Sequence, residues 1–156
     1  MSSHTMTVLW ENAGEPFTDN RYSRAHRWLF DGGVEVVASS SPSVVPVPMS
    51  LEAAVDPEEA FIASLSSCHM LWFLAVTAKA GFKVMRYEDR PEGQITRNDQ
   101  GKAAVTLLTL RPLTVFEGEA PSAETLDALH HQAHDNCFIA HSVKTEIRCE
   151  PRQEDA

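Results

Sequence analysis

The stretch VDPEEAFIASLSSCHMLWFLAVTAKAGF, residues 55–82, carries the signals of a helix with a marked beginning and end. Asp56, Pro57 and Glu59 predict a capping box with proline at the first helical position, in which Asp56 and Glu59 bond each other's backbone N–H groups. Gly81 predicts the end of the helix, because glycine readily adopts the left-handed conformation found there. The middle third is apolar on nearly every side, so we expect this helix to pack in the core.

The residues before this helix predict a small antiparallel sheet. Residues 6–10 predict a short strand, and residues 22–30 alternate as a longer one. One face of the longer strand would carry Tyr22, Arg24, His26, Trp28 and Phe30. The DGG sequence at 31–33 indicates a hairpin, residues 34–39 the returning strand, and the Pro- and Ser-rich residues 40–50 a loop.

The residues after the helix predict further strands at 83–97, interrupted by the turn RPEG, and at 103–116. Pro121 and Ser122 indicate the start of a second helix that leads to Cys137. The last strand, VKTEIRCE, would point Cys149 inward. Strands joined by hairpins and separated by two helices predict an α+β fold with antiparallel sheets packed on the helices, in a single domain over residues 1–156.

Charge and composition argue against several classes of protein. The net charge is −9, and the 13 basic residues form no cluster, so we expect no nucleic-acid partner. The N-terminus lacks a basic segment followed by an apolar core, which favours the cytoplasm. The apolar run at 68–76 is too short to cross a membrane. Three irregularly spaced cysteines do not suggest the disulfide framework of a secreted protein.

Cys68 has two interpretations, a small core hydrophobe or a reactive thiol. It lies about three turns into the helix, too far from its start for the helix dipole to activate it. A reactive Cys68 therefore needs a cation from elsewhere. Arg24 is a candidate, with Glu58 as its carboxylate partner, because capping accounts for Glu59 and leaves Glu58 free. The alternatives are that Arg24 reaches solvent at a sheet edge and that Glu58 only complements the helix dipole.

The other cysteines also have more than one interpretation. Cys137, in the second helix, can form a disulfide with Cys68 only if their Cα atoms lie about 4.4–6.8 Å apart. A metal site is the rival, since histidines and a cysteine recur at spacings of four, three and four and His69 and Cys68 could add ligands. This stripe consists of His130, His134, Cys137 and His141. It lacks a compact ligand pair, which favours solvated or capping histidines. Cys149 is interpreted as a small hydrophobe in the core.

Several of these stretches together resemble the OsmC/Ohr family of osmotically inducible and organic hydroperoxide resistance proteins, and in particular its OsmC-like branch. The resemblance rests on residues 55–82, on AHDNCFIAHSVKTEI some seventy residues later, and on FDGGVEVVASSSP before the helix. It implies an intertwined homodimer and a stress-response peroxidase for organic hydroperoxides, without metal or cofactor. Because the chain has no recognisable redox cofactor site, a dithiol reductant would be needed.

The resemblance also implies the roles of individual residues. Cys68 would be the peroxidatic cysteine and Cys137 the resolving one, ending in a disulfide, with Arg24 and Glu58 beside them. Arg21 is the alternative arginine. Two departures stand out: Phe138 follows the second cysteine where the family often has proline, and a histidine follows the first. The alternative function is a metal-binding or apolar-ligand-binding member of the family without peroxidase activity.

Overall fold

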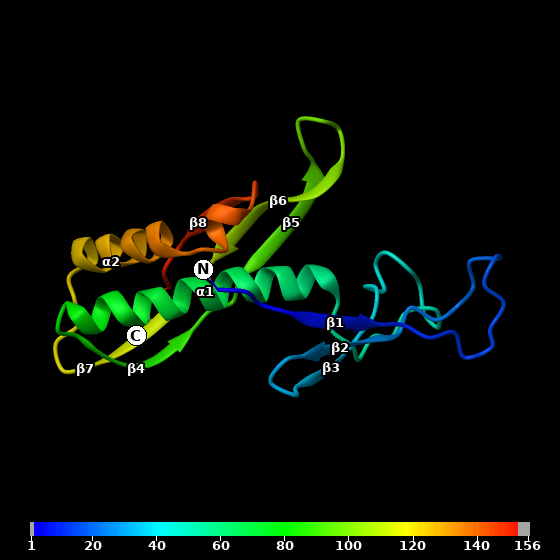
Figure 1. The fold of residues 1–156 in the computed structure, drawn as a ribbon. Coiled ribbons are helices and arrows are strands. Elements are labelled where there is room, and N and C mark those ends of the chain that lie inside the picture. Colours follow the sequence, from blue (N-terminus) through cyan, green and yellow to red (C-terminus); the bar gives the residue numbers. More distant parts are fainter. Residues whose placement is uncertain (1, 153–156) are drawn as a thin grey trace. The chain divides into compact units, whose positions relative to one another are not determined.

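The computed structural model describes residues 2–152, and its elements follow the predicted order (Figure 1). In chain order they are β1 Met6–Leu9, β2 His26–Phe30, β3 Glu35–Ala38, α1 Pro57–Lys79, β4 Lys83–Glu88, β5 Glu92–Arg97, β6 Ala103–Leu110, β7 Leu113–Glu117, α2 Ala123–Asn136, the 3₁₀ helix η1 Ala140–Ser142 and β8 Glu146–Cys149. The chain divides into two compact units, residues 1–60 and residues 61–156, which are described separately below.

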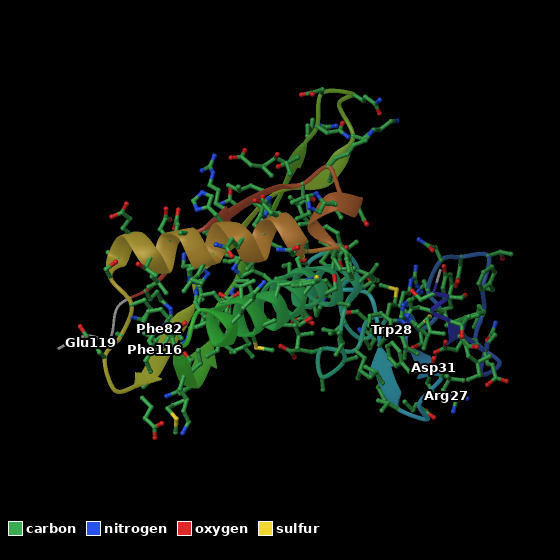
Figure 2. The ribbon with its side chains drawn as sticks, turned by 60° about the vertical axis from the view of Figure 1, so that its left-hand side comes forward. Arg27, Trp28, Asp31, Phe82, Phe116 and Glu119 are labelled. Carbon is green, nitrogen blue, oxygen red and sulfur yellow. The ribbon has the colours of Figure 1, made fainter. Side chains whose placement is uncertain are left out.

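The first unit is built on the antiparallel sheet β1–β2–β3. The hairpin predicted at residues 31–33 is confirmed, because the Phe30 N–H donates to the Val34 carbonyl at 2.9 Å and Gly33 has a φ of +85°. Figure 2 labels Arg27 and Trp28 on β2 and Asp31 in the turn that follows.

The strand predicted over residues 22–30 begins only at His26. Before that point the backbone bonds to loops and side chains instead of a neighbouring strand. The Arg24 N–H donates to the Met49 carbonyl at 2.7 Å, and the Trp10 side chain donates to the Ser23 carbonyl at 2.8 Å. The prediction was therefore wrong for residues 22–25, and Arg24 lies in a loop rather than on a strand face.

Both predicted ends of α1 are confirmed. Asp56 Oδ1 accepts the Glu59 N–H at 2.8 Å, and Glu59 Oε2 accepts the Asp56 N–H at 3.1 Å, which completes the capping box. At the other end Gly81 has a φ of +89°, and the Phe82 N–H donates to the Thr77 carbonyl at 3.2 Å. These local signals fix where the helix starts and stops.

The whole of α1 is longer than the run at 68–76 alone. Its 23 residues, with a mean hydropathy of 1.6 over the most apolar window, have the length and composition to cross a membrane. A core helix of a water-soluble protein passes the same test. Leu65 and Phe73 of α1 are each at most 1% exposed and form the centres of two hydrophobic clusters, as expected of a core helix.

The second unit contains two sheets. In one, β4 pairs with β7; in the other, β5 and β8 flank β6, with β8 running parallel to β6. The single strand predicted at 103–116 was wrong, since β6 ends at Leu110 and β7 begins at Leu113. The intervening Pro112 has no N–H to donate to a sheet ladder, and the chain passes there from one sheet to the other.

Two clusters make up the core of this unit. In the first, Leu65 of α1 packs against Leu108 and Leu110 of β6. In the second, Phe73 packs against Leu129 and Ala133 of α2, which runs alongside α1 (Figure 1). Phe82 and Phe116 pack against the second cluster (Figure 2). Their rings meet edge-to-face, with centroids 6.3 Å apart. The C-terminal half of α1 is thus held between α2 and the β4–β7 pair.

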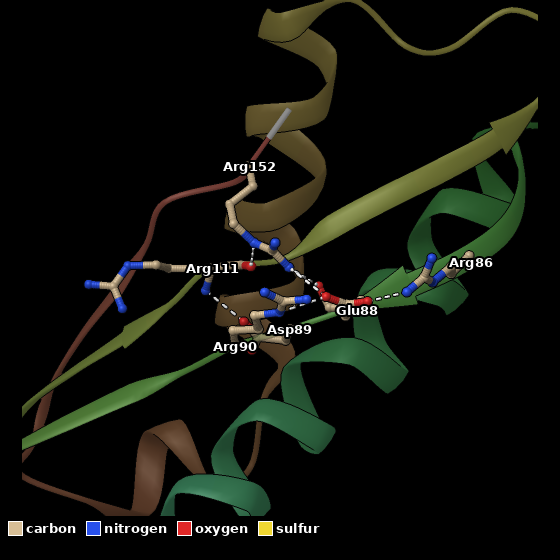
Figure 3. A network of polar contacts seen from close by, with 6 residues as sticks. All are labelled: Arg86, Glu88, Asp89, Arg90, Arg111 and Arg152. Atoms are coloured by element: carbon tan, nitrogen blue, oxygen red, sulfur yellow. Dashed lines mark hydrogen bonds and ion pairs between the residues drawn. The ribbon is translucent and has the colours of Figure 1, made fainter. Parts of the chain in front are cut away.

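A charged network fixes the last described residues against β4 and the start of β7 (Figure 3). Glu88 accepts hydrogen bonds from Arg86, from Arg90 at 2.8 Å and from Arg152 at 3.3 Å. These partners, Arg152 first, lower the pKa of Glu88. The neighbouring carboxylate, Asp89, accepts the backbone N–H of Arg111 at 2.6 Å.

The predicted fold class is confirmed: the chain is α+β, with largely antiparallel sheets packed around two helices. The homodimer and the single-domain organisation over residues 1–156 stay predictions.

Candidate functional site

Cys68 and Cys137 lie against each other in the second unit. Cys68 is half-buried on α1, whereas Cys137 caps the C-terminus of α2 and is 1% exposed. Cys68 lies close enough to Cys137 to act on the pKa of its thiol. Both cysteines are reduced, so the structure corresponds to the dithiol form of this pair.

Burial raises the pKa of Cys137 to about 11, and the neighbouring Cys68 adds to the effect because it favours the protonated thiol. The backbone N–H of Ala140, 3.4 Å from Cys137 Sγ, acts in the opposite direction. At neutral pH Cys137 is therefore a neutral thiol in a dry setting. Such a group is a poor nucleophile on its own, but it can condense with an oxidised sulfur placed next to it.

The end of α2 positions Cys137 through local contacts. The Cys137 N–H donates to the His134 carbonyl at 3.0 Å, which completes the last turn. Phe138 stands where the family often has proline, and its side chain is 71% exposed. Its ring meets the Trp72 ring edge-to-face, with centroids 5.8 Å apart. The phenylalanine thus forms an apolar surface next to the thiol pair, and the turn into η1 forms without proline.

Arg24 and Glu58 line the same hollow of the first unit, about 440 Å³ in volume. Its other lining residues are mostly aromatic or apolar: Val8, Trp10, Phe17, Tyr22, His26, Ser40 and Pro57. Phe17 and Tyr22 stack at 4.5 Å between ring centroids. An apolar hollow with one cation and one carboxylate is a suitable place for an apolar molecule with a single polar group.

The Arg24 guanidinium is held within its own loop. It donates to the Asn20 side chain at 2.7 Å and to the Asn20 and Tyr22 carbonyls, and it lies 3.8 Å from the centre of the Tyr22 ring. Among the described residues, no ion pair joins Arg24 to Glu58, the partner predicted for it. Arg21, the alternative arginine, is exposed and does not line the hollow.

The histidine and cysteine stripe predicted on α2 is not brought together as one ligand set. His141 lies beyond α2 in η1, and its ring bonds the Asp135 carbonyl at 2.7 Å. The group with metal-ligand geometry that the described residues do contain is a different one, made of His69, His130 and Cys149. The sequence analysis assigned Cys149 to the core alone. The available signals were the inward position of Cys149 and a histidine on an otherwise apolar helix.

Comparison with known proteins identifies the family. The model of the family described as OsmC-like protein matches residues 50–152, which is more than half of the chain. The chain belongs to the OsmC-like family. A solved structure of an OsmC-like protein of unknown function from Vibrio cholerae is 53% identical, covers 97% of this chain and 100% of its own, and has a TM-score of 0.95. No curated protein matches the chain.

More distant structures share the OsmC-like fold. OhrB of Bacillus subtilis, an organic hydroperoxide resistance protein, is 15% identical over 98% of both chains, with a TM-score of 0.67. An organic hydroperoxide resistance protein from Elizabethkingia anophelis is 15% identical, covers 100% of this chain and 98% of its own, and has a TM-score of 0.71. These two structures share the fold of this chain, and the recognition of the family from sequence is confirmed.

Proposed function

We propose that this OsmC-like protein is a thiol peroxidase that reduces organic hydroperoxides. The observation that carries the proposal is the contact between the half-buried Cys68 thiol and the buried Cys137 thiol on two different helices. Family membership adds support, since relatives of the same fold are named organic hydroperoxide resistance proteins.

The reaction proceeds in three balanced steps. The Cys68 thiolate attacks the terminal oxygen of ROOH, the O–O bond breaks, and Cys68 becomes a sulfenic acid while the alkoxide leaves and is protonated to the alcohol. The Cys137 thiol then condenses with the sulfenic acid, forming a disulfide and releasing water. An external dithiol finally reduces that disulfide by thiol exchange and is itself oxidised.

We also propose roles for Arg24 and Glu58. Arg24 would favour the Cys68 thiolate and the departing alkoxide, and Glu58 would orient the arginine. Both roles are taken from the family resemblance. Their support from the structure is limited to the first unit, where both side chains line one apolar hollow with a shape and polarity suited to a hydroperoxide with an apolar tail.

The protein is expected to act as a cytoplasmic homodimer that forms one OsmC-like domain over residues 1–156. Large apolar side chains on the second unit support an additional partner surface, because Leu71, Met85 and Phe138 are 62%, 58% and 71% exposed. Light scattering of the purified protein tests this: a mass of two chains supports the homodimer, and a single-chain mass contradicts it.

The experiment that tests the peroxidase proposal is the consumption of cumene hydroperoxide with dithiothreitol as the dithiol. Wild-type protein should turn over, Cys68→Ser should not, and Cys137→Ser should complete the first oxidation and then stop as a sulfenic acid that dimedone traps. Wild-type protein that consumes no peroxide, or a Cys68→Ser variant as active as wild type, would contradict the proposal.

A further inference from the structure

Three side chains from distant parts of the sequence converge in the second unit. His69 of α1, His130 of α2 and Cys149 of β8 each offer one ligand atom, and these atoms all lie within 4.8 Å of one another. His69 Nε2 is 3.0 Å from His130 Nδ1 and 3.9 Å from Cys149 Sγ. Both histidines are buried, at 2% and 3% exposed. Two imidazoles and a thiol are the ligand types that proteins use for zinc.

The distances fit a single ion between the three atoms. Zinc lies about 2.0–2.1 Å from histidine nitrogen and about 2.3 Å from cysteine sulfur, so tetrahedral angles place two such nitrogens about 3.3 Å apart and nitrogen and sulfur about 3.6 Å apart. The observed 3.0 and 3.9 Å differ from these values by only a few tenths of an ångström. The third pair, His130 and Cys149, lies within 4.8 Å, so an ion would bind after the side chains turn and draw together around it.

The cluster is rigid and polar without being fully satisfied. The His130 ring is stacked between His69, with centroids 5.3 Å apart, and Phe73, with centroids 4.2 Å apart. The Nε2 atom of His130 is buried and has no hydrogen-bond partner. It points in a different direction from Nδ1, the ring atom that faces His69, so it is not the atom that would bind an ion between the two histidines.

The surroundings contain candidates for a fourth ligand and carboxylates that favour a cation. The three side chains line a cavity of about 290 Å³ together with Asp127, His131, His134, Leu110 and Ile147. On α2, Asp127, His130 and His134 are spaced three and four residues apart and so share one face. The carboxylates Asp89, Asp127 and Glu150 act on Cys149 and, together with burial as the larger cause, raise the pKa of its thiol to about 12. The same negative field attracts a dication.

Zinc binds histidine in its neutral imidazole form and cysteine as the thiolate. Only Cys149 must lose a proton on binding, and a coordinated zinc ion deprotonates a thiol outright.

We propose that His69, His130 and Cys149 form a zinc site, with Asp127 or His134 of the same cavity as the fourth ligand. The ion links α1, α2 and β8, and its coordinate bonds replace the hydrogen bond between His69 and His130. Binding converts the Cys149 thiol to thiolate and releases that one proton to solvent, with no change in oxidation state. The site shares only His130 and His134 with the stripe considered from sequence, and it uses neither Cys68 nor Cys137.

Cobalt titration of the full chain tests the site, because Co²⁺ takes zinc positions and a cobalt–thiolate bond gives a charge-transfer band in the near ultraviolet. Tag-free protein is stripped with a chelator, reduced and titrated with Co²⁺ alone. We expect one equivalent to bind with this band, release of about one proton, and displacement by one equivalent of Zn²⁺. Wild-type protein that gives no thiolate band would overturn the proposal.

Cysteine variants distinguish this site from the thiol pair. Cys149→Ser should lose the cobalt–thiolate band, whereas Cys68→Ser and Cys137→Ser should keep it. A band that survives in Cys149→Ser, or that disappears in Cys137→Ser, would show that the metal binds elsewhere. If Cys149→Ser fails to fold, the cobalt–thiolate band is measured in Cys149→Ala instead. The comparison with Cys68→Ser and Cys137→Ser then decides the outcome. Peroxide consumption plays no part in this readout, so the metal site and the peroxidase proposal can each fail alone.

Discussion

Cys68 and His69 are neighbours on α1, yet their side chains lie in two different chemical settings. A step of one residue turns a helix by about 100°, so the two groups project in different directions. Cys68 meets a second thiol, Cys137, whereas His69 meets an imidazole and the thiol of Cys149. The first setting suits oxidation and disulfide formation, and the second suits coordination of a cation.

The two settings also differ in what they lack. Within residues 61–152, no hydrogen bond or ion pair brings an arginine or lysine to Cys68. Arg24 is the cation proposed to assist Cys68. In the histidine cluster, by contrast, the carboxylates Asp89, Asp127 and Glu150 act on Cys149, and their charge favours the cation proposed there.

The largest expected effect comes from Cys68. Cys68→Ser should lower turnover of cumene hydroperoxide at least about 1000-fold, because it removes the attacking sulfur. Ser67→Ala, at the exposed neighbouring position, is the matched control and should turn over like wild type. Equal losses in the two variants would mean that the helix surface, and not the thiol, supports activity.

Arg24→Met should lower kcat/KM by roughly 30- to 1000-fold, the cost of about 2–4 kcal/mol of lost charge stabilisation in the transition state. Arg21→Met removes an exposed arginine three residues away and should leave kcat/KM near the wild-type value. If the larger loss appears in Arg21→Met, the assignment of the two arginines is reversed.

Alkylation by iodoacetamide at pH 8 compares Cys137 with an ordinary thiol. Only the thiolate reacts, and raising the pKa from 9.0 to about 11 lowers the thiolate fraction about 100-fold at this pH. The rate at Cys137, located by peptide mass spectrometry, should therefore keep rising with pH up to about 11. A rate that levels off near pH 9 would contradict the dry setting of this thiol.

Zinc should stabilise the chelator-treated protein. At a free concentration 100 times the Kd, binding to the folded state alone adds about 2.7 kcal/mol, which raises Tm by roughly 5–10 °C for a chain of this size. Differential scanning fluorimetry measures the shift, and Cys149→Ser serves as the comparison. Equal shifts in both proteins would place the ion away from Cys149.

The smallest effect concerns the helix that carries both settings. Asp56→Ala removes the side-chain oxygen that accepts the Glu59 N–H, and it should lower the free energy of unfolding by about 1 kcal/mol. Urea denaturation measures this, with Glu52→Ala as a control at an exposed position before the cap. A loss equal to that of the control would mean that the capping box contributes little.

Local signals predicted much of this fold. The capping box at Asp56, the glycine at the end of α1, the hairpin before residue 34 and the Ser122 cap of α2 each depend on residues close in sequence, and each is found. The strand boundaries near Arg24 and Pro112 were missed because they depend on which strand lies alongside. A strand without a pairing partner does not extend, whatever its alternation.

The candidate sites show the same difference between features set by residues close in sequence and features set by distant residues. The family motifs led to the choice of Cys68 and Cys137, and the two thiols do lie together. His69 was considered as an added ligand for the stripe that contains His130, but Cys149, 80 residues from His69, was interpreted only as a core residue. Helical spacing points to ligands on one element, as in the stripe on α2, and it does not detect a site assembled from two helices and a strand.

One measurement tests the central claim most directly. Reduced protein, freed of reductant, is treated with one equivalent of cumene hydroperoxide, and the remaining thiols are counted and mapped by mass spectrometry. Peroxidase chemistry at the proposed pair predicts the loss of two of the three thiols, a Cys68–Cys137 disulfide, and a free Cys149. Survival of all three thiols, or a disulfide that includes Cys149, would contradict the account.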